Sequence, residues 1–132
     1  MKKKINIGDV KIHRKKVSHD DLASFNGEVV HAVCSTFALA REIEWTSRLF
    51  VLDIKEEDEE GVGTKLLINH QSPAFMGDLV EIEAVVDSFS NNELICDYTA
   101  KVGERVIATG STGQKIIKNK KIEKLFSKLN NE

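Results

Sequence analysis

The sequence lacks the features that place a protein in a membrane or outside the cell. No apolar run in its 132 residues approaches the roughly 18 residues that span a bilayer, and no signal-peptide core follows the charged start 1–10. Only two cysteines occur, Cys34 and Cys96. Two thiols so far apart are typical of packed, free cysteines in a reducing compartment. We therefore expect a cytoplasmic protein with no membrane partner.

An excess of charge of either sign is also missing. The sequence contains nineteen Lys and Arg residues and twenty-one Asp and Glu residues, which gives a formal net charge of −2. Basic residues cluster at 2–4, 14–16 and 115–121, but no aromatic residues or reading motifs accompany them. The histidines and cysteines show no metal-ligand spacing, and there is no glycine-rich phosphate loop. We expect no nucleic-acid partner, no metal and no cofactor.

The apolar content of 41% suffices for one ordinary domain over residues 1–132. Residues 35–52 contain neither Gly nor Pro and carry apolar residues at helical spacing, which predicts one long helix. Its expected buried stripe consists of Leu39, Ala40, Ile43, Phe50 and Val51.

Strand patterns surround this helix. They are weak at 10–17 and clear at 62–71, 79–89, 94–102 and 105–117, and a short amphipathic helix is expected at 122–129. The short polar gaps between the last strands predict antiparallel hairpins. Residues 18–33 are the least readable part of the chain. This order predicts an α+β fold whose helix lies across one face of an antiparallel sheet.

Three polar residues stand in otherwise apolar settings. Thr36 falls near the middle of the helical stripe, so its hydroxyl is expected to face the core, and Glu44 lies about 80° round at the edge of the stripe. His70 ends a strand on its more apolar face. The small Ala40 lies between Thr36 and Glu44 and leaves room for a ligand along the helix. A hydroxyl, a carboxylate and an imidazole are groups that acyl-transfer chemistry uses.

Each of the three also has a plain structural explanation. Thr36 could cap the start of the helix. Glu44 could form surface ion pairs with Arg41 and Arg48. His70 could be a core histidine with satisfied hydrogen bonds. For each residue taken alone, the structural explanation is the more common one.

Taken together, the three residues resemble the pattern of the fluoroacetyl-CoA thioesterase-like group of hotdog-fold proteins. In that group a helix carries a Thr and, eight residues on, a Glu, and a later strand ends in His. Here these are Thr36, Glu44 followed by Trp45, and His70. The resemblance continues through three further segments: Gly61–Thr64, His70–Gly77 with Pro73, and Ile107–Thr112.

This resemblance implies a hotdog fold, a long central helix wrapped by an antiparallel sheet, with two subunits paired as a homodimer and acyl-CoA thioesters bound near their interface. It implies an acyl-CoA thioesterase in which His70 is the general base, Thr36 orients or activates the nucleophile, and Glu44 attacks the thioester carbonyl or positions water. The residues expected to line the substrate site are Gly63, Thr64, Ala40 and Phe37, with the Gly63 N–H as a candidate oxyanion donor.

The sequence departs from the best-known member of the group in two places. Thr112-Gly113-Gln114 stands where that protein has His-Glu-Arg, so an arginine contact is missing, and segment 25–31 is not a Phe-rich lid. Fluoroacetyl-CoA itself is therefore not the expected substrate. The alternative is a non-catalytic hotdog protein that binds acyl-CoA or another apolar ligand. A hydratase is disfavoured, because residues 20–34 lack the Asp, Asn-Pro and His run of such relatives.

Overall fold

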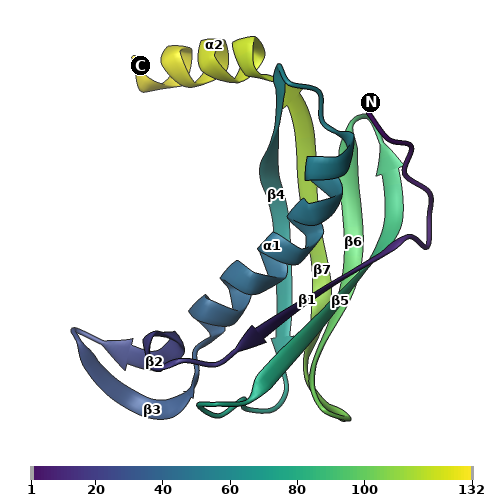
Figure 1. Cartoon of the computed structure of the whole chain (residues 1–132). Helices are drawn as coiled ribbons and strands as arrows, with labels where there is room; N and C mark the ends of the chain where they lie inside the picture. The colour runs from purple at the N-terminus through teal and green to yellow at the C-terminus, as the bar shows by residue number, and fades with distance from the viewer. Residues whose placement is uncertain (1, 132) are drawn as a thin grey trace.

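The computed structural model describes residues 2–131 and contains a strongly curved five-stranded sheet (Figure 1). The strand order is β1-β5-β6-β7-β4, and all neighbouring pairs are antiparallel. The strands are β1 Val10–Lys16, β4 Glu59–His70, β5 Leu79–Ser90, β6 Glu93–Val102 and β7 Arg105–Lys118. The predicted α+β layout is confirmed.

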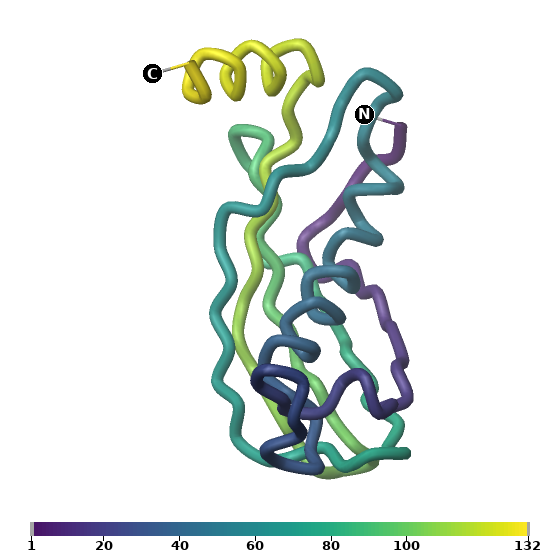
Figure 2. Tube along the Cα trace, turned by 90° about the vertical axis from the view of Figure 1, so that its left-hand side faces the viewer, coloured from purple at the N-terminus to yellow at the C-terminus, as the bar shows by residue number. Residues whose placement is uncertain are grey.

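The long helix α1, Thr36–Ile54, lies across the concave face of this sheet (Figure 2). It extends two residues beyond the predicted end at Leu52. Its buried side chains recur every three or four residues, as expected for one face of a helix: Ala38, Leu39, Ile43, Thr46, Ser47, Phe50, Val51 and Ile54. The apolar ones among them form one core with the inward-facing residues of β5, β6 and β7. The predicted stripe is therefore confirmed except at Ala40, which is only half-buried.

Tight turns join the last three strands as the sequence predicts. Asn91 and Asn92 both adopt left-handed backbone conformations between β5 and β6, with φ of 53° and 62°. Such turns match the twist of paired strands, and asparagine tolerates this conformation better than most residues. Strand β4 begins three residues before the predicted Val62, because Glu59 pairs in register with Lys118 of β7.

A small second sheet fills the segment that the sequence left unread. It consists of β2, Leu22–Phe25, and β3, Glu28–Cys34, preceded by a short 3-10 helix, η1, His19–Asp21. Asn26 and Gly27 form its turn, with φ of 56° and 82°. The end of β3 is tied to the loop before β5, where the Cys34 N–H donates to the Ala74 carbonyl over 2.7 Å.

The chain ends in helix α2, Asn119–Asn130, which follows β7 directly. None of its residues is buried. Figure 1 shows α2 projecting from the end of the sheet past β4. Among the described residues, no helix combines the length and the apolar character that crossing a membrane requires.

Candidate active site

The start of α1 and the end of β4 bring Thr36 and His70 together. Thr36 Oγ1 and His70 Nδ1 lie 2.9 Å apart, a hydrogen-bond distance. The capping explanation for Thr36 is wrong, because Ser35 caps the helix and its Oγ accepts the Ala38 N–H over 3.0 Å. The Thr36 hydroxyl is thus available to the imidazole.

Thr36 does not face the core as predicted. The residue is exposed, and the buried stripe of α1 begins only at Ala38. The first turn of the helix lies beside the end of the edge strand β4, so the neighbour of Thr36 is the half-buried His70 and not the apolar interior. The imidazole and hydroxyl are therefore both accessible to a ligand in the single chain.

The carboxylate of Glu44 lies in a different part of the surface, two turns further along α1. It lines an open groove of about 390 Å³ between α1, β4 and β7. The groove is completed by Gly63, Thr64, Lys65, Leu66, Thr112, Gly113 and Gln114. An adjoining groove of about 280 Å³ shares Glu44, Gly63 and Gln114. Glu44 thus meets two of the expected substrate-site residues, Gly63 and Thr64.

Glu44 forms no ion pair with either neighbouring arginine. Arg48 Nη1 lies 2.9 Å from Glu60 Oε1, and Arg41 pairs with Asp21 and Glu42. Within residues 2–131, the side-chain carboxylate of Glu44 has no hydrogen-bond or ion-pair partner, although the backbone carbonyl of Glu44 accepts the Ser47 hydroxyl over 3.1 Å. The surface ion-pair explanation is therefore wrong, and an unpaired carboxylate faces the groove.

A β-bulge shapes the wall of this groove. Gly63 pairs with Gln114 and Lys65 with Gly113, so Thr64 is the extra residue on β4. A bulge bends its strand and redirects the side chain it carries. A side chain at Gly113 would start 2.6 Å from Thr64 Oγ1, so it would displace the side chain of the bulged threonine.

The remaining expected substrate-site residues lie outside these grooves. Phe37 is 82% exposed on the first turn of α1, and Ala40 is half-buried between Thr36 and Glu44. The eight residues from Thr36 to Glu44 correspond to about 12 Å along the helix axis. The structure thus brings Thr36 next to His70 and Glu44 next to the bulge of β4. These two groups of predicted site residues make no direct contact with each other.

Gln114 lines the groove, although the sequence analysis noted it only as a departure from the His-Glu-Arg run of the best-known member of the group. It is 8% exposed, and its Nε2 donates to Ser47 Oγ over 2.9 Å. Strand alternation from the buried Ile116 could have placed Gln114 and Thr112 on the inward face of β7. A buried amide at a groove wall is a polar group that a ligand can meet.

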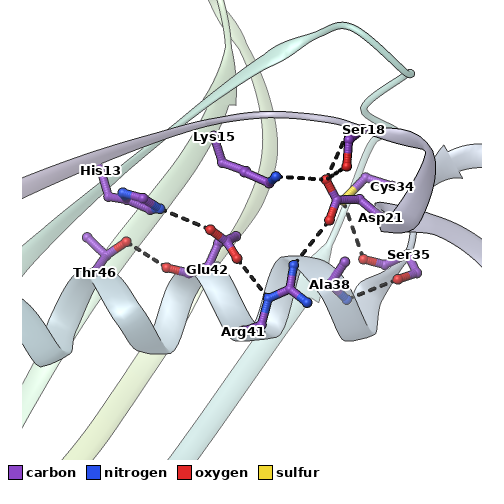
Figure 3. Close-up of polar contacts among 10 residues, drawn as sticks. All are labelled: His13, Lys15, Ser18, Asp21, Cys34, Ser35, Ala38, Arg41, Glu42 and Thr46. Atoms are coloured by element: carbon purple, nitrogen blue, oxygen red, sulfur yellow. Dashed lines mark hydrogen bonds and ion pairs between the residues drawn. The ribbon is translucent and has the colours of Figure 1, made fainter.

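A network of polar side chains fixes the start of α1 (Figure 3). The carboxylate of the buried Asp21 accepts the Ser18 N–H and pairs with Lys15 of β1 and Arg41 of α1. The Ser35 N–H also donates to the Asp21 carbonyl over 2.8 Å. This network holds η1, β1 and the helix N-terminus together, and with them the position of Thr36.

Electrostatics disfavour either thiol as a nucleophile. Burial raises the pKa of Cys34 to about 11 and that of Cys96 to about 12, so both are neutral near pH 7. A neutral thiol is a poor nucleophile. In the described part of the chain, no group of three or more His, Cys, Asp or Glu side chains could hold a metal ion.

Comparison with solved structures identifies the class of fold. A hypothetical protein of Thermus thermophilus, described as a thioesterase superfamily member, is 26% identical with a TM-score of 0.90, covering 97% of this chain and 95% of its own. A hot-dog-like protein of Thermanaerovibrio acidaminovorans is 22% identical with a TM-score of 0.81, covering 92% and 90%. The chain is a hotdog-fold protein.

The family follows from the sequence match. The model of the fluoroacetyl-CoA-specific thioesterase family, FlK, matches residues 17–120, and this chain belongs to that family. The structure of the fluoroacetyl-CoA thioesterase FlK itself is 19% identical with a TM-score of 0.84, covering 98% of both chains. No curated protein matches the chain.

Proposed function

We propose that this protein is an acyl-CoA thioesterase, which hydrolyses a thioester to a free acid and CoA. The observation that carries the proposal is the 2.9 Å contact between Thr36 Oγ1 and His70 Nδ1. A positioned imidazole with an accessible neighbour is suited to general base work at neutral pH. Membership of a thioesterase family supports the same reaction.

His70 is the proposed base in either tautomer. If Nδ1–H donates to Thr36, the free lone pair is on Nε2 and can take a proton from water. If Nδ1 is unprotonated, it accepts the Thr36 hydroxyl proton and can activate that oxygen. In both cases Thr36 fixes the ring, and the proton removed is later available to the departing CoA sulfur.

Glu44 is the proposed carboxylate at the thioester. Because it is unpaired and lines the groove with Gly63, it can either attack the carbonyl carbon or hold the attacking water. Attack by Glu44 would expel CoA and leave an acyl anhydride, which water then cleaves. The glycine at Gly63 has open space around it, which suits a close approach of the thioester oxygen to the main chain.

We further propose that the working unit is a homodimer joined through β4. This strand is at the sheet edge, and its Leu66 and Leu67 are 38% and 49% exposed. A two-fold axis through such an edge pairs the strand antiparallel with its own copy, which satisfies its unpaired backbone groups. The candidate site lies along the same strand, so the second copy would border it.

A cytoplasmic location stays a prediction.

The acyl group is proposed to differ from fluoroacetyl. Solved structures of FlK include one in complex with fluoroacetate and CoA, but here the groove carries the Gln114 amide in place of the expected arginine. In the β2–β3 sheet the only phenylalanine is Phe25, which is 72% exposed. Both the arginine contact and the Phe-rich lid that the resemblance associates with a fluorinated substrate are therefore missing from these positions.

A panel of CoA thioesters tests the proposal. Short, branched, aryl and long-chain acyl-CoAs are incubated with the protein, and released thiol is measured. The proposal predicts turnover of at least one class. Binding to the panel without thiol release from any member would contradict it and would favour the non-catalytic alternative.

A further inference from the structure

Helix α2 carries an apolar face that the rest of the described chain leaves largely uncovered. Ile122, Leu125, Phe126 and Leu129 recur at spacings of three and four residues and fall within an arc of about 100°. Leu125, Phe126 and Leu129 are 47%, 56% and 54% exposed. Such a stripe on a three-turn helix is stable in water only when it packs against another surface.

The body of the protein fixes where this helix points. Lys118 Nζ lies 3.0 Å from Asp58, and the Asn119 N–H donates to the Asp58 carbonyl over 2.8 Å. These contacts anchor α2 to the turn before β4. In both views α2 projects from the end of the sheet, clear of α1 (Figure 1 and Figure 2). The helix thus extends past the free edge strand β4 and does not cover the chain's own core.

We propose that the apolar face of α2 packs on a second copy of this chain. The inference rests on the homodimer through β4 proposed above. Antiparallel pairing of two β4 strands places the α2 end of one copy beside the opposite end of the other copy's sheet. That opposite end exposes an apolar patch, Phe75, Met76 and Leu79, which are 50%, 59% and 53% exposed.

The positions of the lysines on α2 favour a second copy of the chain over a lipid surface as the partner of the apolar face. Lys120 and Lys124 lie opposite the apolar arc, and Lys121 and Lys128 lie along only one of its two borders. The other border carries Glu123 and Asn130 and no cation. A helix that lies in a bilayer surface needs cations along both borders of its apolar face, at the level of the headgroups, whereas packing on protein makes no such demand.

Two double variants test the docking, because the residues changed are exposed and lie outside the candidate site. Leu125→Glu with Phe126→Glu lowers the charge of α2 by two and removes the apolar face. Lys120→Ala with Lys124→Ala makes the same charge change on the polar side. Sedimentation velocity should show the dimer dissociation constant rising at least about 10-fold in the first variant and staying within about 2-fold in the second.

A cross-link locates the contact. One preparation carries Leu125→Cys and the other Met76→Cys, and the two are mixed and oxidised; the native thiols are buried and do not compete. A disulfide-linked heterodimer is the expected product. A wild-type protein that is monomeric at every concentration would overturn the proposed homodimer and this docking with it.

A dimer whose dissociation constant is unchanged by Leu125→Glu with Phe126→Glu, and which forms no cross-link, would overturn the α2 docking alone. If instead both double variants lose binding to phosphatidylserine vesicles while the dimer is unaffected, the helix face belongs to a membrane surface and the proposal is wrong. Thiol release from the acyl-CoA panel is measured separately, so the thioesterase proposal stands or falls on its own.

Discussion

Two adjacent hydroxyl residues at the start of α1 have different tasks. Ser35 caps the helix by accepting the Ala38 N–H, whereas Thr36, one residue on, contacts His70. A Ser-Thr pair before a helix does not reveal which hydroxyl caps it, because either side chain can accept the same backbone donors. The distinction depends on where β4 ends, which is tertiary information.

Substitutions at these two positions should therefore have opposite consequences. Thr36→Ala removes the contact to the imidazole and should lower kcat/KM at least about 10²-fold without changing the melting temperature. Ser35→Ala should cost about 1 kcal/mol of stability and leave kcat/KM within a few-fold. Steady-state kinetics and thermal unfolding of both variants provide the check. A Thr36→Ala variant that is unstable and fully active would reverse the assignment.

A second matched pair of carboxylates separates activity from stability in the same way. Glu44 is unpaired, so Glu44→Gln should leave the free energy of unfolding within about 0.5 kcal/mol and lower kcat/KM at least about 10²-fold. Glu42 contacts His13 over 3.0 Å and Arg41 over 2.9 Å, so Glu42→Gln should lower stability and spare activity. Normal rates in a folded Glu44→Gln variant would remove Glu44 from the mechanism.

At the scale of elements, the sequence predicted both helices and the strands of the main sheet, and it missed the small β2–β3 sheet. The stripe of α1 and the alternation of β5 and β6 are imposed by burial, which a periodic pattern records. Strands β2 and β3 are mostly exposed, so no burial pattern marks them. Their one signal was Asn26-Gly27, a pair strongly favoured in hairpin turns.

The Asp21 network links β1, η1 and α1, and its stability should depend on pH. Burial acts to raise the pKa of Asp21, but hydrogen bonds from Ser18 and the charge of Lys15 outweigh it and hold the pKa below its usual value. A carboxyl with a lowered folded pKa stabilises the protein above its unfolded pKa, and this stability is lost as the pH falls through the folded value.

Asp21→Asn should therefore be less stable than the wild type at pH 7 by about 1 kcal/mol or more, with the difference shrinking as the pH falls from about 5 to below 3. Urea unfolding at a series of pH values measures this. The neighbouring Asp20 is exposed, and Asp20→Asn serves as the control with little effect. A stability difference for Asp21→Asn that persists unchanged at pH 3 would show that its charge is not responsible.

At the scale of the whole molecule, the candidate site could be predicted only in part from local patterns. Neither the helical spacing of Thr36 and Glu44 nor the strand that ends in His70 indicates that β4 lies beside the first turn of α1. The family resemblance supplied that combination. Gln114 was harder to foresee, because its importance arises from a groove that three separate elements enclose.

The most direct test of the account compares His70→Ala with the wild type on the acyl-CoA that the panel shows to be hydrolysed fastest. Because His70 is the proposed base held by Thr36, kcat/KM for thiol release should fall at least about 10²-fold in a variant that keeps the wild-type circular dichroism spectrum. A folded His70→Ala variant that releases CoA at the wild-type rate would contradict the account.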